Sequence, residues 1–168
     1  MHLSGENVKK FIVEGTPVKI GPNGVDVGVS EIRRIPEGSE ITIHGDKREL
    51  SKPKQLVLPA NGFYELEPGF YELRSNVKLK IPEGVVLYVK PRSTFNRLGC
   101  VKVESAVCDS GYEGFFTQSI LLPFKAKIHE GEAWFQLVGF KCQKSGQKYE
   151  GFYQGEKPGT KSFLSDDQ

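Results

Sequence analysis

The chain begins with a helical pattern of apolar residues. In residues 4–13, Val8, Phe11 and Ile12 occupy positions i, i+3 and i+4, which line one face of a helix. Ser4 precedes them and can accept a hydrogen bond from the first turn. The pattern predicts one short amphipathic helix near the N-terminus.

From Pro17 onward the pattern is that of β-strands, because apolar and polar residues alternate between clusters of turn-forming residues. Residues 62–73 repeat Gly-Phe-Tyr-Glu-Leu around a Glu-Pro turn, which predicts two strands joined by a tight connection. Alternation between turn signals also predicts strands at residues 18–20, 25–29, 41–43, 77–81, 85–89, 101–107, 115–122 and 134–140.

About ten strands with almost no helix predict an all-β domain of jelly-roll-like or barrel-like form. Residues 93–98 interrupt the strands, with a polar start, good helix formers and Gly99 behind them, so a second short helix is expected there. The length of 168 residues suits a single domain spanning 1–168. Residues 144–168 are rich in Gly, Lys, Ser and Asp and should form an exposed C-terminal arm, ordered only where something docks it.

The charge pattern excludes several classes of partner. The formal net charge is +2, and basic residues are interspersed with acidic ones, so no footprint for nucleic acid is present. No stretch approaches the ~20 apolar residues of a membrane span, and no signal-like segment opens the chain. We therefore expect a cytoplasmic protein with no membrane partner. The charge pattern still allows a small anionic ligand.

Cysteine and histidine spacing argues against zinc chemistry. The three cysteines form no Cys-x-x-Cys pair and are expected to be reduced thiols, and none of the three histidines stands at metal-ligand spacing. The His-x-Glu and Pro-Cys-x-x-Cys motifs of zinc-dependent nucleobase deaminases do not occur.

Two segments carry candidate chemistry. Arg92, Ser93 and Thr94 lead into the second predicted helix, where a guanidinium, hydroxyls and backbone N–H groups favour an anion such as phosphate. The alternative is an ordinary helix cap with a solvated arginine. Asp109 and Tyr112 lie in a glycine-containing turn, where a carboxylate can orient water and an aromatic ring can contact a sugar, although turn aspartates are often structural.

Other polar residues have two possible uses. Asp26 and Gln136 stand in apolar strands and need partners, which could be ligand or protein groups. The segment 149–161 combines aromatic residues, glycines and lysines, as a flap closing over a polyphosphate would, but a plain tail looks similar.

Taken in order, these segments resemble the motifs of the dUTP pyrophosphatase and dCTP deaminase superfamily, and in particular its deaminase branch. The order of the matches makes the resemblance specific, since no single motif does. The matching segments are residues 3–15, 24–28, 66–71, 91–99, 109–114, 136–137 and 153–155.

The resemblance implies a distorted jelly-roll fold and a homotrimer whose three active sites lie at subunit boundaries. It also implies that Asp109 contacts the 3′-hydroxyl and positions the attacking water, and that Tyr112 packs on deoxyribose. Mg²⁺ would be carried by the triphosphate, with Asp26 in its outer shell. The substrate-binding residues implied by the motifs, with the first three holding phosphates, are Arg92, Ser93, Thr94, Arg97, Tyr112, Gln136, Tyr153, Gln154 and Lys157.

The reaction class depends on one residue. Deamination in this superfamily uses a glutamate as proton shuttle at C4 of the base, beside an arginine that Arg97 matches. Ser119 stands at the glutamate's place, and no Asp or Glu occurs between Gly114 and His129. We therefore expect hydrolysis of dUTP to dUMP and pyrophosphate, which requires only positioned water, metal and phosphate clamps.

Two alternatives are left open. One is a dCTP deaminase, or a bifunctional enzyme, that uses a carboxylate not identified from the sequence. The other is a catalytically silent nucleotide-binding regulatory trimer. Glu156 and Phe152 suggest the latter, because relatives commonly carry Gln and Lys at these places, and a carboxylate would repel phosphate unless a nearby lysine compensates.

Overall fold

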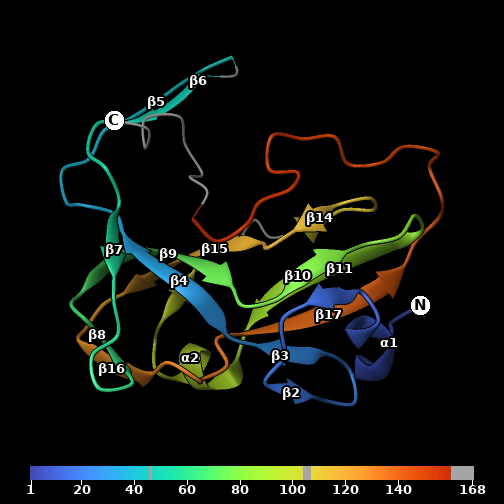
Figure 1. Ribbon diagram of the computed structural model, residues 1–168, viewed down its shortest axis with the longest axis horizontal. Helices are drawn as coiled ribbons and strands as arrows, with labels where there is room; N and C mark the ends of the chain where they lie inside the picture. Colours follow the sequence, from blue (N-terminus) through green and yellow to red (C-terminus); the bar gives the residue numbers. More distant parts are fainter. Residues whose placement is uncertain (46, 104–106, 160–168) are drawn as a thin grey trace.

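The computed structural model describes residues 1–45, 47–103 and 107–159, and these are almost entirely β-structure (Figure 1). Two five-stranded sheets form the body. The first has the order β13 (Val107–Cys108), β11 (Val85–Pro91), β17 (Phe135–Lys141), β3 (Val25–Val27) and β2 (Lys19–Ile20). The second has the order β12 (Val101–Lys102), β15 (Thr117–Leu122), β9 (Gly69–Ser75), β4 (Val29–Arg34) and β7 (Gln55–Val57).

Smaller sheets and two helices complete the fold. A three-stranded sheet joins β1 (Ile12–Glu14), β10 (Lys78–Lys80) and β14 (Glu113–Gly114). Two-stranded sheets pair β8 (Phe63–Leu66) with β16 (Ala126–His129) and β5 (Ile41–His44) with β6 (Lys47–Leu50). The helices are α1 (Gly5–Lys9) and α2 (Ser93–Arg97). The all-β prediction is confirmed, but within the described ranges the sheets are open and do not close into a barrel.

The core lies where the long strands turn one face inward. Residues of β15 and the first five residues of β11 alternate between buried and half-buried positions, as a strand with one more buried face should. Among the largest fully buried side chains are Trp134, Tyr71, Phe135, Leu73 and Leu137. The core is therefore built between the two five-stranded sheets and fixes the positions of β9, β15 and β17.

The N-terminal helix is shorter than predicted. Ser4 caps α1 and accepts a hydrogen bond from the Asn7 N–H at 3.4 Å, as expected. The chain then leaves the helix, and Ile12 pairs with Leu79 of β10. Phe11 is already held by β10, since its carbonyl oxygen accepts from the Lys80 N–H at 2.8 Å. Strand pairing with a distant segment thus replaces the last helical turn of the prediction.

Two strand predictions are corrected by topology. Both strands of residues 62–73 form, but β8 pairs with β16 while β9 pairs with β15 and β4, so the connection is not a hairpin. The single strand predicted at 101–107 is divided between two sheets, with β12 beside β15 and β13 beside β11. Residues 104–106, between them, lie outside the described part of the chain. The sequence pattern also did not predict β1, β6, β7, β14 and β16.

The C-terminal arm docks on its own chain. After β17 it runs back over β14 toward β15 (Figure 1). The Tyr149 N–H donates to the Ser110 carbonyl oxygen, and the Phe115 N–H donates to the Glu156 carbonyl oxygen, each at 2.8 Å. The arm predicted at 144–168 is described as far as residue 159, and residues 160–168 lie outside the described residues. In the described residues, neither helix has the length or apolarity to cross a membrane.

Candidate active site

A tight turn after β13 presents the aspartate and tyrosine singled out from the sequence. The Tyr112 N–H donates to the Asp109 carbonyl oxygen at 3.1 Å, which closes the turn. Gly111 has φ of +89°, a conformation that residues with a Cβ rarely adopt, and its N–H donates to the Ile81 carbonyl oxygen at 2.8 Å. Asp109 is exposed, whereas Tyr112 is only 6% exposed.

Both glycines of this motif leave room for the arm. A Cβ on Gly111 would stand 2.8 Å from Lys148 Cβ, and a Cβ on Gly114 would stand 3.0 Å from the Glu156 nitrogen. The arm is then held by the backbone of the turn, because Gln154 accepts from the Glu113 N–H and donates to the Gly111 carbonyl oxygen, both at 3.0 Å. The spacing of glycines in the motif therefore permits arm docking as well as the turn.

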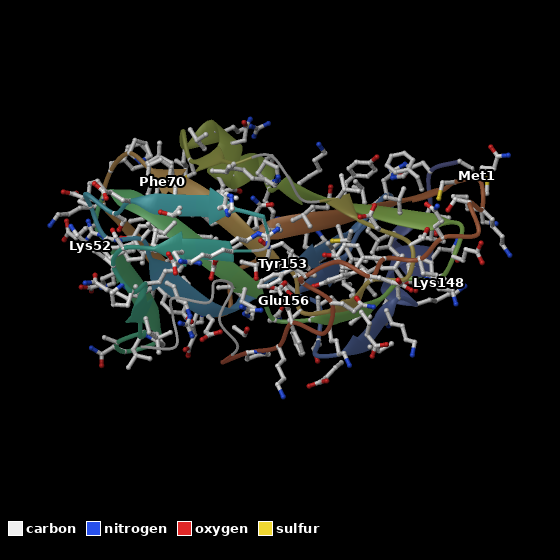
Figure 2. All side chains as sticks on the ribbon, turned by 90° about the horizontal axis from the view of Figure 1, so that it is seen from above. Met1, Lys52, Phe70, Lys148, Tyr153 and Glu156 are labelled. Carbon is white, nitrogen blue, oxygen red and sulfur yellow. The ribbon has the colours of Figure 1, made fainter. Side chains whose placement is uncertain are left out.

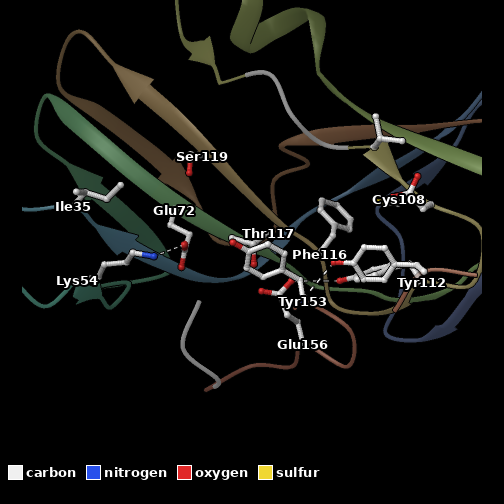
Figure 3. A pocket seen from close by; sticks show the side chains of 13 residues that line it. Ile35, Lys54, Glu72, Cys108, Tyr112, Phe116, Thr117, Ser119, Tyr153 and Glu156 are labelled. Carbon is white, nitrogen blue, oxygen red and sulfur yellow. Dashed lines mark hydrogen bonds and ion pairs between the residues drawn. The ribbon is translucent and has the colours of Figure 1, made fainter. Parts of the chain in front are cut away.

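The turn, the arm and β15 enclose a cavity of about 490 Å³ (Figure 3). Tyr153 and Glu156, which border it, lie in the middle of the molecule (Figure 2). The lining residues are Ile35, Lys54, Glu72, Val107, Cys108, Asp109, Tyr112, Phe116, Thr117, Ser119, Tyr149, Tyr153 and Glu156.

One end of the cavity is aromatic. The Tyr112 ring meets the Tyr149 ring edge-to-face at 5.7 Å between centroids. Burial, together with the neighbouring Glu156 carboxylate, raises the pKa of Tyr112 above its ordinary value. Burial also raises the pKa of the Cys108 thiol to about 12, so the thiol stays protonated and is not a nucleophile at neutral pH. This end of the cavity is therefore lined by two tyrosine rings, with Asp109 also in the lining.

Glu156 enters the cavity from the arm with an unusual protonation equilibrium. Burial raises its pKa to about 7, and the Arg74 guanidinium, 3.7 Å from Glu156 Oε1, opposes that increase. Its Oε2 lies 3.5 Å from the Tyr112 hydroxyl. A protonated glutamate has nearly the shape and hydrogen-bonding groups of glutamine, the residue that relatives commonly carry at this position. Near pH 7, where part of Glu156 is protonated, its repulsion of phosphate is therefore reduced.

The other end of the cavity holds a buried ion pair that the sequence analysis missed. Lys54 Nζ lies 2.5 Å from Glu72 Oε2, and their side chains are 1% and 9% exposed. Glu72 on β9 stands directly opposite Ser119 on β15 in the antiparallel register. Figure 3 shows this pair and Ser119 on the opposite side of the cavity from Tyr112. A carboxylate is therefore present beside the serine after all, although it comes from the neighbouring strand and is paired with a lysine.

A second polar group forms around Asp26. Arg92 Nε lies 3.1 Å from Asp26 Oδ2, and Gln136 Nε2 donates to Asp26 Oδ1 at 3.2 Å. The sheet register makes this contact, because Gln136 of β17 is opposite Asp26 of β3 and Lys90 of β11. The buried polar residues flagged in the sequence thus find partners in one another.

The predicted substrate-binding residues are divided in this chain. Asp109, Tyr112 and Tyr153 line the cavity. Ser93, Thr94 and Arg97 are exposed on α2, next to the Arg92–Asp26–Gln136 group. Among the described residues that line the cavity, none belongs to α2 or to this group. Gln154 and Lys157 belong to the docked arm, where Gln154 binds the backbone of the turn.

Several residues in or beside the cavity were not singled out from the sequence. Glu72, which lines the cavity, and Arg74, which contacts Glu156, stand at alternate positions of β9 and are buried polar residues. Lys54 lies in a connection between strands, and no periodic pattern indicated its burial. Tyr149 was included only in the general flap hypothesis.

The described residues contain no grouping of three or more His, Cys, Asp or Glu side chains suited to a metal ion. Asp26 is the carboxylate proposed for an outer shell, and both of its oxygens are engaged by Arg92 and Gln136. This arrangement does not fit a metal held directly by the protein.

Comparison with known proteins gives relatives over most of the chain. A probable deoxyuridine 5′-triphosphate nucleotidohydrolase from Aeropyrum pernix is 33% identical over 161 residues, covering 93% of this chain and 99% of the relative. A dCTP deaminase, dUMP-forming, from Sulfurihydrogenibium is 28% identical over 178 residues, covering 98% and 97% of the two chains.

The fold has a counterpart among solved structures. The crystal structure of a 2′-deoxycytidine 5′-triphosphate deaminase from Agrobacterium tumefaciens matches with a TM-score of 0.62 and 14% identity, over 82% of this chain and 46% of that chain. At this identity the match shows the fold alone. Residues 2–141 match the family described as dCTP deaminase-like, and this span contains the Arg92, Asp109 and Gln136 motifs. The chain belongs to the dCTP deaminase-like family, which includes proteins named as dUTP hydrolases and dCTP deaminases.

Proposed function

We propose that the protein hydrolyses dUTP to dUMP and pyrophosphate. The observation that carries the proposal is the cavity in which exposed Asp109 borders the buried ring of Tyr112. Relatives such as the Aeropyrum pernix protein carry the name of a dUTP nucleotidohydrolase, which agrees with this activity.

The geometry suggests a role for each end of the turn. The Tyr112 ring offers a flat face to deoxyribose, and its close packing against Tyr149 leaves little room for a 2′-hydroxyl. The Asp109 carboxylate accepts a hydrogen bond from the 3′-hydroxyl and from a water, and it orients that water toward the α-phosphorus. The water oxygen forms the new bond to the α-phosphorus, and the proton that the water loses passes to the Asp109 carboxylate. The bond from the α-phosphorus to the bridging oxygen breaks, and pyrophosphate leaves with that oxygen.

A phosphate clamp would come from a neighbouring copy of the chain. Arg92, Ser93 and Thr94 lie together at the start of α2 but do not line the cavity of their own chain. A homotrimer with sites at subunit boundaries would bring this group against the cavity of the next copy. Mg²⁺ would enter on the triphosphate and neutralise part of its charge, and Asp26 would contact it only through water. The described residues contain no group of three or more His, Cys, Asp or Glu side chains that could hold the ion directly.

Product analysis tests the proposed reaction. The protein is incubated with Mg²⁺ and either dUTP or dCTP, and the products are separated by ion exchange; dUMP should form from dUTP while dCTP is unchanged. Asp109→Asn should lower kcat by about 10²- to 10⁴-fold with nucleotide binding retained. Glu65→Gln, at a side chain 70% exposed, is the matched control and should leave kcat unchanged. Equal turnover in wild type and Asp109→Asn would exclude the assigned role.

Mixing inactive variants tests the shared site. Asp109→Asn and Arg92→Ala should each have strongly reduced activity alone. If the site combines Asp109 of one copy with Arg92 of another, co-refolded mixtures should regain part of the activity, because some sites receive both intact residues. No recovery in mixtures shown to exchange subunits would contradict the shared arrangement.

The carboxylate beside Ser119 favours a second candidate, a dCTP deaminase. Glu72 lies in the cavity directly across from Ser119, and a deaminase needs a carboxylate to move protons at the base. Its pairing with Lys54 argues against this role, because the buried Glu72 carboxylate is already engaged by the Lys54 ammonium. Formation of dUTP or dUMP from dCTP would replace the proposed function with this one.

A further inference from the structure

The β5–β6 hairpin projects from the two main sheets and has no part in the proposed reaction (Figure 1). Its strands pair with each other in a two-stranded sheet, and all four residues of β5 are exposed. Its base is closed because the Ser51 N–H donates to the Glu40 carbonyl oxygen and the Glu40 N–H donates to the Ser51 hydroxyl, both at 2.8 Å. A two-stranded hairpin is only marginally stable by itself, so contacts beyond this base help to fix its position.

One face of the hairpin contacts the C-terminal arm. Arg48 stands opposite Ile43 in the antiparallel register, so their side chains share a face. Lys47 and Glu49 belong to the other face, where they form an ion pair at 3.0 Å. The Arg48 guanidinium carbon lies over the Phe152 ring, 4.9 Å from its centre. At this distance the cation is attracted to the face of the ring.

Phe152 belongs to a turn of the arm that packs on itself. The Tyr153 N–H donates to the Tyr149 hydroxyl at 3.3 Å, and the Gln154 N–H donates to the Gly151 carbonyl oxygen at 3.1 Å. A Cβ on Gly151 would stand 2.4 Å from the Tyr149 ring, so this ring fills the turn. The Phe152 and Tyr153 rings meet edge-to-face at 5.2 Å between centroids. Because Tyr149 and Tyr153 both line the cavity, a contact that holds Phe152 also holds two rings of the cavity wall.

The arm is anchored on both sides of Phe152. Before it, the Tyr149 N–H donates to the Ser110 carbonyl oxygen at 2.8 Å. After it, the Gly159 N–H donates to Glu31 Oε2 on β4 at 3.2 Å. Phe152 lies between these anchors, and its side chain is 48% exposed. The Arg48 stack therefore adds an attachment to the part of the arm that the two anchors leave between them.

We propose that the β5–β6 hairpin is a clasp for the arm, in which Arg48 stacked on Phe152 holds the arm over the cavity and limits access to it. This inference does not depend on which reaction the cavity supports. Release of the arm removes Tyr149, Tyr153 and Glu156 from the cavity wall, so any ligand would exchange through that opening. A cation–π contact at an exposed site corresponds to a change of about 2- to 5-fold in the population of the open state.

The thiol of Cys108 is a built-in probe of this opening. Cys108 lines the cavity and is 6% exposed, and burial raises its pKa to about 12. The thiol should therefore react with iodoacetamide only when the arm opens and water reaches it. Peptide mass spectrometry separates its alkylation from that of Cys100 and Cys142. At low reagent concentration the arm recloses faster than the thiol reacts, so the rate reports the population of the open state.

Two substitutions remove the stack while keeping most of each side chain. Arg48→Gln and Phe152→Leu should each raise the alkylation rate of Cys108 by about 2- to 5-fold. The double variant should show no larger increase than either single variant, because both substitutions remove the same contact. The matched controls are Lys47→Gln, on the opposite face of the hairpin, and Phe70→Leu, at a ring with the same exposed fraction of 48%. Both controls should leave the rate unchanged.

Charge reversal gives a rescue test. Phe152→Lys places an ammonium beside the Arg48 guanidinium, and this repulsion should open the arm more than Phe152→Leu does. Arg48→Glu combined with Phe152→Lys replaces the stack with an ion pair and should bring the alkylation rate back toward that of wild type. The rescue requires the two side chains to be neighbours when the arm is closed.

Hydrogen exchange locates the opening in the arm. The Gly155 N–H donates to the Glu113 carbonyl oxygen at 2.8 Å, and its exchange should accelerate by the same factor as the alkylation of Cys108. The free energy of global unfolding in urea should stay that of wild type, because the Arg48–Phe152 contact lies outside the core. Neither readout requires turnover, so the clasp is tested even if the proposed function fails.

Three results would overturn the inference. Unchanged alkylation of Cys108 in both Arg48→Gln and Phe152→Leu would show that the contact does not hold the arm. Additive increases in the double variant would show that the two residues act separately. An equal increase in Lys47→Gln, or an increase matched by a loss of global unfolding free energy, would assign the effect to the charge of the hairpin or to general destabilisation.

Discussion

Glu156 should make the stability of the protein depend on pH in a direction opposite to that of most carboxylates. Burial raises its pKa to about 7 in the folded chain, from an ordinary value of 4.5. The folded state therefore binds a proton more tightly than the unfolded state between these pH values. Because proton binding and folding are linked, protonated Glu156 adds to the unfolding free energy fully below pH about 4.5, and this addition is lost as pH rises through about 7.

The size of the effect follows from the difference between the two pKa values. A difference between about 7 and 4.5 corresponds to about 3 kcal/mol of unfolding free energy lost between pH 4.5 and pH 8. The side chain is 12% exposed, so solvent screening reduces this figure only slightly. Release of the arm limits the loss, because Glu156 regains water when the arm undocks. Glu156→Gln retains a neutral hydrogen-bonding side chain of the same shape and should remove the pH dependence.

Urea unfolding at pH 5, 6, 7 and 8 measures this directly. The unfolding free energy of wild type relative to Glu156→Gln should fall across the series by at most about 2.5 kcal/mol, since the series begins at pH 5 and undocking of the arm limits the loss. Hydrogen exchange gives a local readout, because the Phe115 N–H donates to the Glu156 carbonyl oxygen at 2.8 Å and should lose protection at high pH only in wild type. Parallel pH profiles for the two proteins would refute the reasoning, since Glu156 would then titrate normally. Glu65→Gln, on the surface, is the control.

Three further substitutions test the packing around the site by urea unfolding. Gly111→Ala should cost about 1–3 kcal/mol and speed proteolysis of the arm, because φ is +89° and the new Cβ would stand 2.8 Å from Lys148 Cβ; Gly146→Ala, also at positive φ but with open space around it, should cost less and leave the arm intact. Leu73→Ala should lower the unfolding free energy by about 2–5 kcal/mol, because Leu73 is fully buried. A smaller decrease would mean that neighbouring side chains move to fill the space left by the leucine. Arg92→Gln should cost about 1–3 kcal/mol and raise the KM for dUTP, and an unchanged KM would remove Arg92 from the phosphate clamp.

Local patterns predicted the kinds of element well. Alternation predicted the strands that became β11, β15 and β17, because a strand with one more buried face has that period. The repeated Gly-Phe-Tyr-Glu-Leu segment predicted β9, which is buried on both faces from Tyr71 to Ser75. Ser4 and Gly99 marked one end each of the two helices. The helix prediction failed after Lys9, where pairing of Ile12 with Leu79 outweighed the helical spacing.

By itself, the sequence determined the all-β class, the turn that carries Asp109 and Tyr112, and the absence of an acidic residue on the strand that carries Ser119. These are properties of short segments, where local sterics and burial periodicity act directly. Only the tertiary structure decided that Glu72 lies opposite Ser119, that Lys54 pairs with it, and that Glu156 is buried with a raised pKa. Strand register and arm docking join residues far apart in the chain, and their energies depend on the whole packed core rather than on any local pattern.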